Sequence, residues 1–222
     1  MPSETFKNLP PDKQQKLINH FLREFSIQPY DHASLTAVVK TLGIAKGSIY
    51  QYFGSKLDLF LFLADHCYQI KQQYAAHVQR HDFPDFWTYF RALSKTGLQF
   101  DRERPLESNF LHALAQNINS PSLKEVHQKW LNDVIAGFTA LVQYEVDQGL
   151  FRKDLPVKTM GYYLYKFCLS FGDYMKVMYE IDIDERIQAG QSIYDEKNAL
   201  LIMQVIDEFI LLSRPAFEKQ IT

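Results

Sequence analysis

Apolar residues recur at helical spacing along most of the chain, and no segment shows the strict alternation typical of a half-buried strand. Prolines stand where several of these patterns begin, because proline is tolerated in the first turn of a helix. The pattern predicts an all-α fold of about nine helices, with a short turn near 184–190. The expected helices cover about 10–26, 34–42, 45–53, 56–80, 84–102, 105–118, 121–149, 156–180 and 192–213.

Two of these helices are short and follow each other closely. Ser34 can cap the first, because its hydroxyl can accept a hydrogen bond from a free backbone N–H. Gly43 ends that helix, since a residue without Cβ tolerates a positive φ. Ile49 and Phe53 form the buried side of the second helix. Two short helices joined by a turn that contains glycine are typical of a helix-turn-helix.

The other side of the second short helix carries groups that match DNA. Lys46 can reach guanine acceptors or a phosphate, Gln51 can bond an adenine edge, and Ser48 can bond the bases of either strand. Gly47 allows a close approach of the backbone. The helix cap Ser34, the phenols of Tyr50 and Tyr52, and the ammonium group of Lys56 in the next helix could also contact DNA. The predicted DNA-binding residues are therefore Ser34, Lys46, Gly47, Ser48, Tyr50, Gln51, Tyr52 and Lys56.

The segment GIAKGSIYQYFGSKLDLF, residues 43–60, resembles the DNA-binding signature of the tetracycline-repressor (TetR) family. Ala45 departs from that signature, in which a capping Ser or Thr is usual, so a capping bond in the first turn is in question. The matching positions are Gly43, Ile44, Gly47, Ser48, Ile49, Tyr50, Tyr52, Phe53, Ser55 and Lys56. The resemblance implies that four of the positions face bases (Lys46, Gly47, Ser48, Tyr50) and two face phosphates (Tyr52, Lys56).

The resemblance also implies a division of the chain and an assembly. We expect a DNA-binding domain over 1–55 and a ligand-binding and dimerisation domain over 56–222, joined by the helix over 56–80. The helix over 156–180 carries apolar residues at a 3.6-residue period, and the helix over 192–213 is apolar on most sides, so that it needs to be covered on both sides. A wholly intramolecular core would satisfy them, but the family dimerises through its last two long helices, and we expect a homodimer.

Aromatic side chains are frequent after residue 82. Such residues are usually core, although helix bundles do place ligand sites between helices. The candidates for contacts with a small apolar or aromatic effector are Trp87, Phe90, Phe110, His112, Trp130 and Phe171. The predicted function is a transcriptional regulator, a repressor released from a pseudo-palindromic operator by this effector. The alternatives are a ligand-independent dimeric regulator and a protein-interaction module with a disabled helix-turn-helix.

Composition narrows the class of protein further. The formal net charge is −2, while residues 1–60 hold seven Lys or Arg and five Asp or Glu, so charge alone does not identify a nucleic-acid surface. Two distant cysteines and the lack of a signal-like or membrane-spanning segment favour a cytoplasmic location. No catalytic motif is present, and we expect neither an enzyme nor a cofactor. His77 and His81 share a predicted helix face, but a zinc site needs further ligands.

Overall fold

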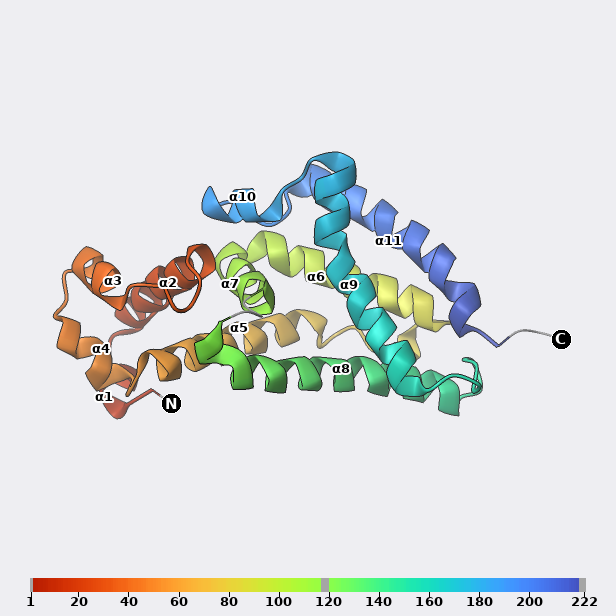
Figure 1. Cartoon of the computed structure of the whole chain (residues 1–222), viewed down its shortest axis with the longest axis horizontal. Coiled ribbons are helices and arrows are strands. Elements are labelled where there is room, and N and C mark those ends of the chain that lie inside the picture. Colours follow the sequence, from red (N-terminus) through yellow and green to blue (C-terminus); the bar gives the residue numbers. More distant parts are fainter. Residues whose placement is uncertain (1, 117–119, 220–222) are drawn as a thin grey trace. The chain divides into compact units, whose positions relative to one another are not determined.

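The computed structural model describes residues 2–116 and 120–219, except for the side chain of Lys46 (Figure 1). This part of the chain is all-α, as predicted, with eleven α-helices, two short 3-10 turns and one isolated bridge between Phe151 and Glu218. The helices are α1 (Glu4–Lys7), α2 (Pro11–Ile27), α3 (Leu35–Leu42), α4 (Lys46–Tyr52), α5 (Lys56–Ala75), α6 (Phe86–Glu103), α7 (Pro105–Gln116), α8 (Lys124–Asp147), α9 (Val157–Tyr179), α10 (Ile183–Gln188) and α11 (Glu196–Phe217).

The chain forms two compact units, which are described separately. The first unit consists of Met1–Tyr74, Phe100–Lys124 and Arg186–Ile193. The second unit consists of Ala75–Gln99, Glu125–Glu185 and Tyr194–Thr222. The predicted division into a DNA-binding domain over 1–55 and a ligand-binding and dimerisation domain over 56–222 is a division by function, and it stays a prediction.

The first unit is built around aromatic side chains of α2, α5 and α7. The ring of Phe60 lies 5.2 Å from that of Phe25 and 5.2 Å from that of Phe110, measured between centroids. Helix α7 packs along α2 (Figure 1). Distant segments are also bonded to the end of α2 and to the loop after it. Gln188 Nε2 donates to the carbonyl of Ile27 (3.0 Å), and Ser120 Oγ donates to Asp31 (2.7 Å).

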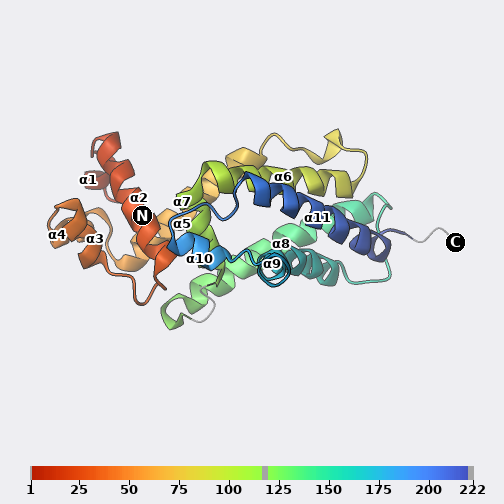
Figure 2. The same ribbon diagram turned by 90° about the horizontal axis from the view of Figure 1, so that it is seen from above.

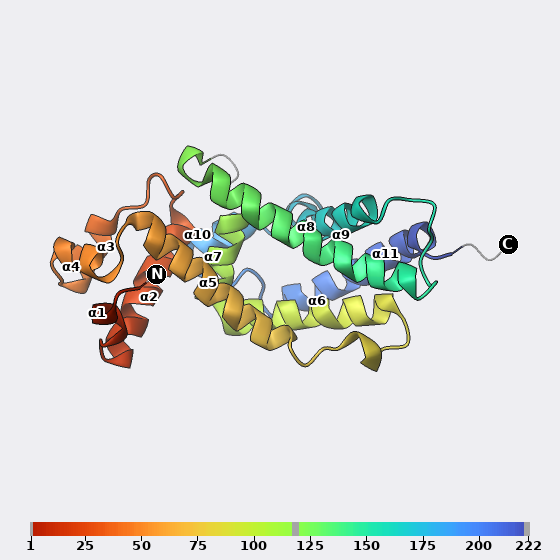
Figure 3. The same cartoon turned by 90° about the horizontal axis from the view of Figure 1, so that it is seen from below.

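The second unit packs the 86–99 part of α6 with α8, α9 and α11. Helices α6 and α11 run side by side (Figure 2), and Arg91 and Asp207 join them through an ion pair of 2.6 Å. Helices α8 and α9 also lie against each other (Figure 3). A Cβ at Gly161 would lie 2.8 Å from the Cα of Thr139, so glycine is required for this approach.

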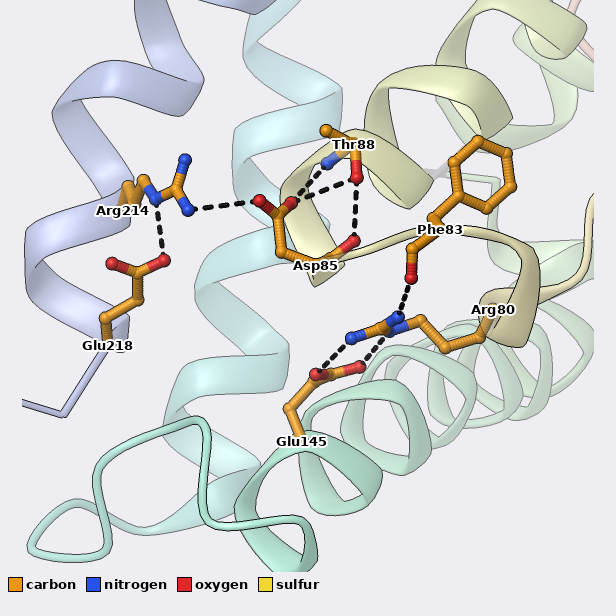
Figure 4. Close-up of polar contacts among 7 residues, drawn as sticks. All are labelled: Arg80, Phe83, Asp85, Thr88, Glu145, Arg214 and Glu218. Atoms are coloured by element: carbon orange, nitrogen blue, oxygen red, sulfur yellow. Dashed lines mark hydrogen bonds and ion pairs between the residues drawn. The ribbon is translucent and has the colours of Figure 1, made fainter.

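An ion pair between the half-buried Arg80 and the buried Glu145 ties the segment after α5 to α8. Both guanidinium nitrogens Nε and Nη2 of Arg80 donate to the carboxylate of Glu145, and Nη1 donates to the carbonyl of Phe83 at 2.8 Å (Figure 4). The Glu145 side chain is only 1% exposed. Nearby, Arg214 of α11 donates to Asp85 at 3.1 Å. These contacts hold residues 80–85 against two helices that are distant in sequence.

The structure corrects some predicted boundaries. Helix α5 ends at Ala75 instead of near residue 80, so His77 and His81 do not share a helix face. The last helix begins after its N-cap, Asp195, and continues through Pro215. Helix α1 was not predicted, and the short turn expected near 184–190 is the helix α10.

Candidate DNA-binding site

Helices α3 and α4 form the predicted helix-turn-helix. Ser34 caps α3, because its Oγ accepts a hydrogen bond from the N–H of Ala37 at 3.2 Å. Its own N–H donates to Glu24 of α2 at 2.7 Å. Gly43 has φ +67°, the left-handed conformation that glycine adopts most readily, and it turns the chain into α4.

Helix α4 is short and has little support of its own. It contains seven residues, and its N-cap, Ala45, makes no side-chain capping bond. The capping bond that Ser or Thr would make at this position is therefore absent at Ala45. Ile49 and Phe53 are buried, with 1% and 2% exposure, and anchor one side of the helix. Helices of this length are unstable alone, so the neighbours of α4 must hold it in place.

The opposite side of α4 faces outward. Gly47, Tyr50 and Gln51 are exposed, and Ser48 and Tyr52 are half-buried. Tyr50 keeps 49% of its surface accessible. The structure therefore brings these five predicted residues together on one short helix. The side chain of Lys46 lies outside the described part of the chain.

Lys56, at the start of α5, is engaged within the protein. Its Nζ donates to the carbonyl of Ala33 at 2.6 Å and lies 4.8 Å from the centre of the Tyr30 ring. Burial lowers the pKa of Lys56, and the carboxylates of Asp31 and Glu24 act in the opposite direction. An ammonium group has three N–H donors, so a phosphate contact is compatible with the bond to Ala33 and stays a prediction.

An N-terminal segment that the sequence analysis missed contacts α4. The backbone N–H of Ser3 donates to the carbonyl of Tyr52 at 2.9 Å, and its Oγ donates to the carbonyl of Gln51 at 2.7 Å. Phe6 is 2% exposed and packs against the ring of Phe53, with centroids 4.9 Å apart. A serine followed by an acidic residue is a signal for a helix start, and Ser3 with Glu4 carries it.

The predicted effector residues are divided between the two units. Trp87 and Phe90 are buried in the second unit, which also contains the half-buried Trp130 and Phe171. The Phe90 and Phe171 rings both contact Phe167, at 5.5 and 5.1 Å. A role of these four residues in ligand binding stays a prediction.

The other two candidates, Phe110 and His112, belong to α7 in the first unit. Phe110 is fully buried, and its ring contacts those of Phe25 and Phe60. This packing gives Phe110 a structural role, since it attaches α7 to α2 and α5. His112 is half-buried. Ligand contacts of both residues stay predictions.

Among the described residues of the second unit, two buried side-chain polar atoms have no hydrogen-bond partner. They are Nε1 of Trp87 and Nε2 of His127, in side chains that are 2% and 7% exposed. His127 lies beside Trp130, with ring centroids 5.8 Å apart. Buried polar groups usually have a hydrogen-bond partner, so each of these two atoms is a candidate for a hydrogen bond to another molecule. His127 was not among the predicted site residues, because a lone histidine in a helix carries no distinctive pattern.

The arrangement defines a helix-turn-helix protein with an outward-facing second helix. Residues 19–63 match the family described as "Bacterial regulatory proteins, tetR family". This match covers the second half of α2, all of α3 and α4, and the first turns of α5. Over residues 19–63 the chain therefore carries the helix-turn-helix domain of the TetR family of transcriptional regulators.

Similar proteins agree with this assignment. The uncharacterised HTH-type transcriptional regulator YvdT of Bacillus subtilis is 27% identical over 147 residues, which cover 62% of this chain and 72% of the relative. The crystal structure of a TetR family transcriptional regulator from Chloroflexus aurantiacus is 27% identical, with a TM-score of 0.77 over 99% of this chain and 100% of that one. The family and these relatives are regulators, not enzymes, as the sequence analysis predicted.

A more distant structure shares the fold. It is a putative transcriptional regulator from Saccharomonospora viridis in complex with choline, 14% identical, with a TM-score of 0.63 over 95% of this chain and 100% of that chain. In residues 2–116 and 120–219 of the present chain, no helix has the length and apolar character needed to cross a membrane.

Proposed function

We propose that this protein is a homodimeric repressor that binds a pseudo-palindromic operator through α4 and is released by a small apolar or aromatic ligand. The observation that carries the DNA-binding part is Gly47. A Cβ at this position would meet no atom of the described residues within 4 Å, so their packing does not require glycine. Glycine inside a helix costs roughly 0.5–1 kcal/mol relative to alanine. Close approach of an external backbone, such as that of DNA, accounts for this cost.

The neighbours of Gly47 supply the chemistry for reading DNA. Gln51 offers an amide that can bond both polar atoms of an adenine edge in the major groove. Tyr50 and Ser48 offer hydroxyl groups for bases or phosphates, and Tyr52 and Lys56 lie at the end of the helix and just after it. Ser34 serves as the cap of α3, whose N-terminal N–H groups favour a nearby phosphate.

The exposed surface of α9 and α11 supports the homodimer. Large apolar side chains are solvent-accessible on both helices within the second unit: Val177 (77% exposed), Met178 (59%), Leu200 (71%), Leu211 (71%) and Leu212 (76%). Exposing such residues in water is unfavourable, and a second copy of the same surface would cover them. The two copies would each present one α4 to successive major grooves, about 34–36 Å apart or a multiple of that spacing.

The effector part rests on the interior of the second unit. Trp87 and Phe90 provide an aromatic environment, in which Trp87 Nε1 is buried without a partner among the described residues. Leaving a buried polar atom unpaired costs about 1–3 kcal/mol, which a ligand with a matching polar atom would recover. A related fold from Saccharomonospora viridis is described in complex with choline, and another is described as a gamma-butyrolactone receptor.

Release requires only that the ligand favours a conformation of the dimer that fits the operator poorly. A coupling free energy of about 1–3 kcal/mol corresponds to a 5–150-fold loss of operator affinity. By the same linkage, operator DNA must lower the affinity of the protein for the ligand by the same factor. A regulator that acts on DNA belongs in the cytoplasm.

Selection from a pool of random DNA duplexes tests the DNA-binding proposal. Purified protein should retain fragments with an inverted repeat, and the two half-sites should be centred one helical turn or a multiple apart. Fragments without any shared repeat would contradict it. A thermal-shift screen with a metabolite panel, followed by calorimetry with and without the selected DNA, tests the effector: equal ligand affinity in both cases would show that the protein is not released by that molecule.

A further inference from the structure

The N-terminal segment is bonded to the end of α4 that carries the predicted base-reading residue. The last carbonyls of a helix have no partner inside the helix and need external donors. Ser3 supplies two such donors, its N–H to Tyr52 and its Oγ to Gln51, at 2.9 and 2.7 Å. The Gln51 carbonyl belongs to the same residue whose side chain is proposed to bond adenine.

Apolar packing reinforces these two hydrogen bonds. Phe6 is 2% exposed and lies among the rings of Tyr52, Phe53 and Phe62, at centroid distances of 6.0, 4.9 and 5.5 Å. Ser3 Oγ also accepts the N–H of Phe6 at 3.3 Å, which makes it the N-cap of α1. One side chain therefore starts α1 and holds the C-terminal end of α4.

The opposite end of α4 has no comparable support. Ala45 makes no side-chain capping bond, and the helix has only seven residues. A short helix that is uncapped at its beginning depends on contacts with its end and its buried side. Loss of the Ser3 contacts would leave Ile49 and Phe53 as its anchors while the exposed residues of α4 gain freedom.

We propose that Ser3 and Phe6 are positioning residues for DNA recognition: the 2–7 segment holds α4 in the conformation that binds the operator. The inference rests on the proposed role of α4 in reading DNA. Its physical basis is that a protein binds with an apparent affinity reduced by the fraction of molecules in the competent conformation. Ser3 raises that fraction by bonding the backbone of α4, without touching DNA itself.

Substitutions at Ser3 separate the two bonds. Ser3→Thr keeps both donors, and Ser3→Ala removes only the hydroxyl. Ser3→Pro removes the hydroxyl and the N–H, and it fits the backbone because Ser3 has φ −71°. Ser26→Ala is the matched control, since the Ser26 hydroxyl donates to Leu22 within α2 and makes no bond to α4.

Two measurements on the full chain decide the inference. The first is affinity for the duplex selected by the wild-type protein from the random pool. We expect Ser3→Thr and Ser26→Ala to match wild type, Ser3→Ala to bind roughly 3–10-fold more weakly per subunit, and Ser3→Pro to bind more weakly still. The second is amide hydrogen exchange of free protein, in which α4 should exchange faster in the two weak variants while α2 and the melting temperature are unchanged.

Wild-type affinity and wild-type exchange of α4 in Ser3→Pro would overturn the inference. Equal acceleration of exchange in α2 and α4 would also overturn it, because it would show a general loss of stability instead of a local one. A wild-type protein that retains no DNA would contradict the proposed function, and the exchange of α4 would still decide whether Ser3 holds this helix.

Discussion

Helices α4 and α11 differ in what supports them and in what they expose. Helix α11 has 22 residues and a side-chain cap from Asp195, whereas α4 has seven residues and no side-chain cap. The exposed side of α11 includes Leu200, Leu211 and Leu212, while that of α4 includes Gly47, Tyr50 and Gln51. The apolar surface of α11 is suited to contact with another protein chain. The polar surface of α4, which includes a glycine, is suited to the proposed contact with DNA.

The difference also concerns where stability comes from. The second unit contains its own long helices and the ion pair between Arg80 and Glu145, while α4 depends on its buried side chains and on residues 2–7. A helix as short as α4 keeps its conformation only through contacts with its surroundings. Substitutions in the two regions should therefore differ in whether they change stability or binding.

The largest expected effect is on the stability of the second unit. Arg80→Ala leaves the buried Glu145 carboxylate without its partner and should lower the free energy of unfolding by about 3–5 kcal/mol. Urea denaturation measures this. Replacing both residues, by Arg80→Met with Glu145→Leu, should recover most of the loss, because no buried charge remains. A double variant as unstable as the single one would show that packing, not charge, dominates.

The second prediction tests the apolar surface of α9 and α11. Val177→Glu with Leu212→Glu should raise the dimer dissociation constant by at least 30-fold, about 2 kcal/mol, while the monomer stays folded because both positions are exposed. Operator affinity should fall as well, since separate monomers lose the effective concentration of linked half-sites. Analytical ultracentrifugation measures the assembly.

Tyr144→Glu is the control for this pair. Tyr144 is a similarly exposed apolar residue, 48% accessible, but it lies on α8. The Tyr144→Glu variant should remain dimeric. If it dissociates as much as the double variant, then charge on any part of the second unit, rather than on α9 and α11, prevents association.

The third prediction concerns the polar side of α4. Gln51→Ala should reduce the preference for the selected operator over a variant with one changed base pair by about 1–3 kcal/mol, the value of one good base contact. Competition binding with the two duplexes measures this preference. Gln72→Ala, at an exposed position of α5, should leave it unchanged. Weaker binding of Gln51→Ala to both duplexes by the same factor would mean that Gln51 contacts phosphate instead of a base.

The smallest effect is a gain in stability at Gly47. Gly47→Gln should stabilise the protein by roughly 0.5–1 kcal/mol, because glutamine favours a helix more than glycine and its Cβ would meet no atom of the described residues within 4 Å. The same variant should bind operator more weakly, since the side chain occupies the space proposed for DNA. Thermal melting and a gel shift would show the two opposite changes, and unchanged operator binding would contradict the proposed approach of DNA at Gly47.

The sequence predicted the helix-turn-helix well because its determinants are local. Ser34, Gly43 and the apolar pair Ile49 and Phe53 act within a few residues of their own positions. The end of α5 could not be found in this way, because no glycine or proline marks it. There, Arg80 is bonded to Glu145, which lies 65 residues later.

Helix α1 could not be predicted either. A four-residue helix has no useful periodicity, and Ser3 is bonded to a residue 48 positions away. The division of the predicted effector residues between two units was also not readable, since aromatic spacing along a helix does not tell which neighbours it will meet. Local patterns predicted α4, whereas the bonds that hold its end come from residues about 48 positions away and could not be predicted.

The most direct test of DNA reading by α4 is the ratio of two affinities, measured by fluorescence anisotropy with wild-type protein. One duplex carries the selected inverted repeat, and the other has the same composition in scrambled order. We predict at least a 1,000-fold preference for the selected duplex at about 150 mM salt, the lower end of the range for specific DNA-binding proteins, with both affinities falling as salt rises. Equal affinity for the two duplexes would contradict sequence-specific recognition.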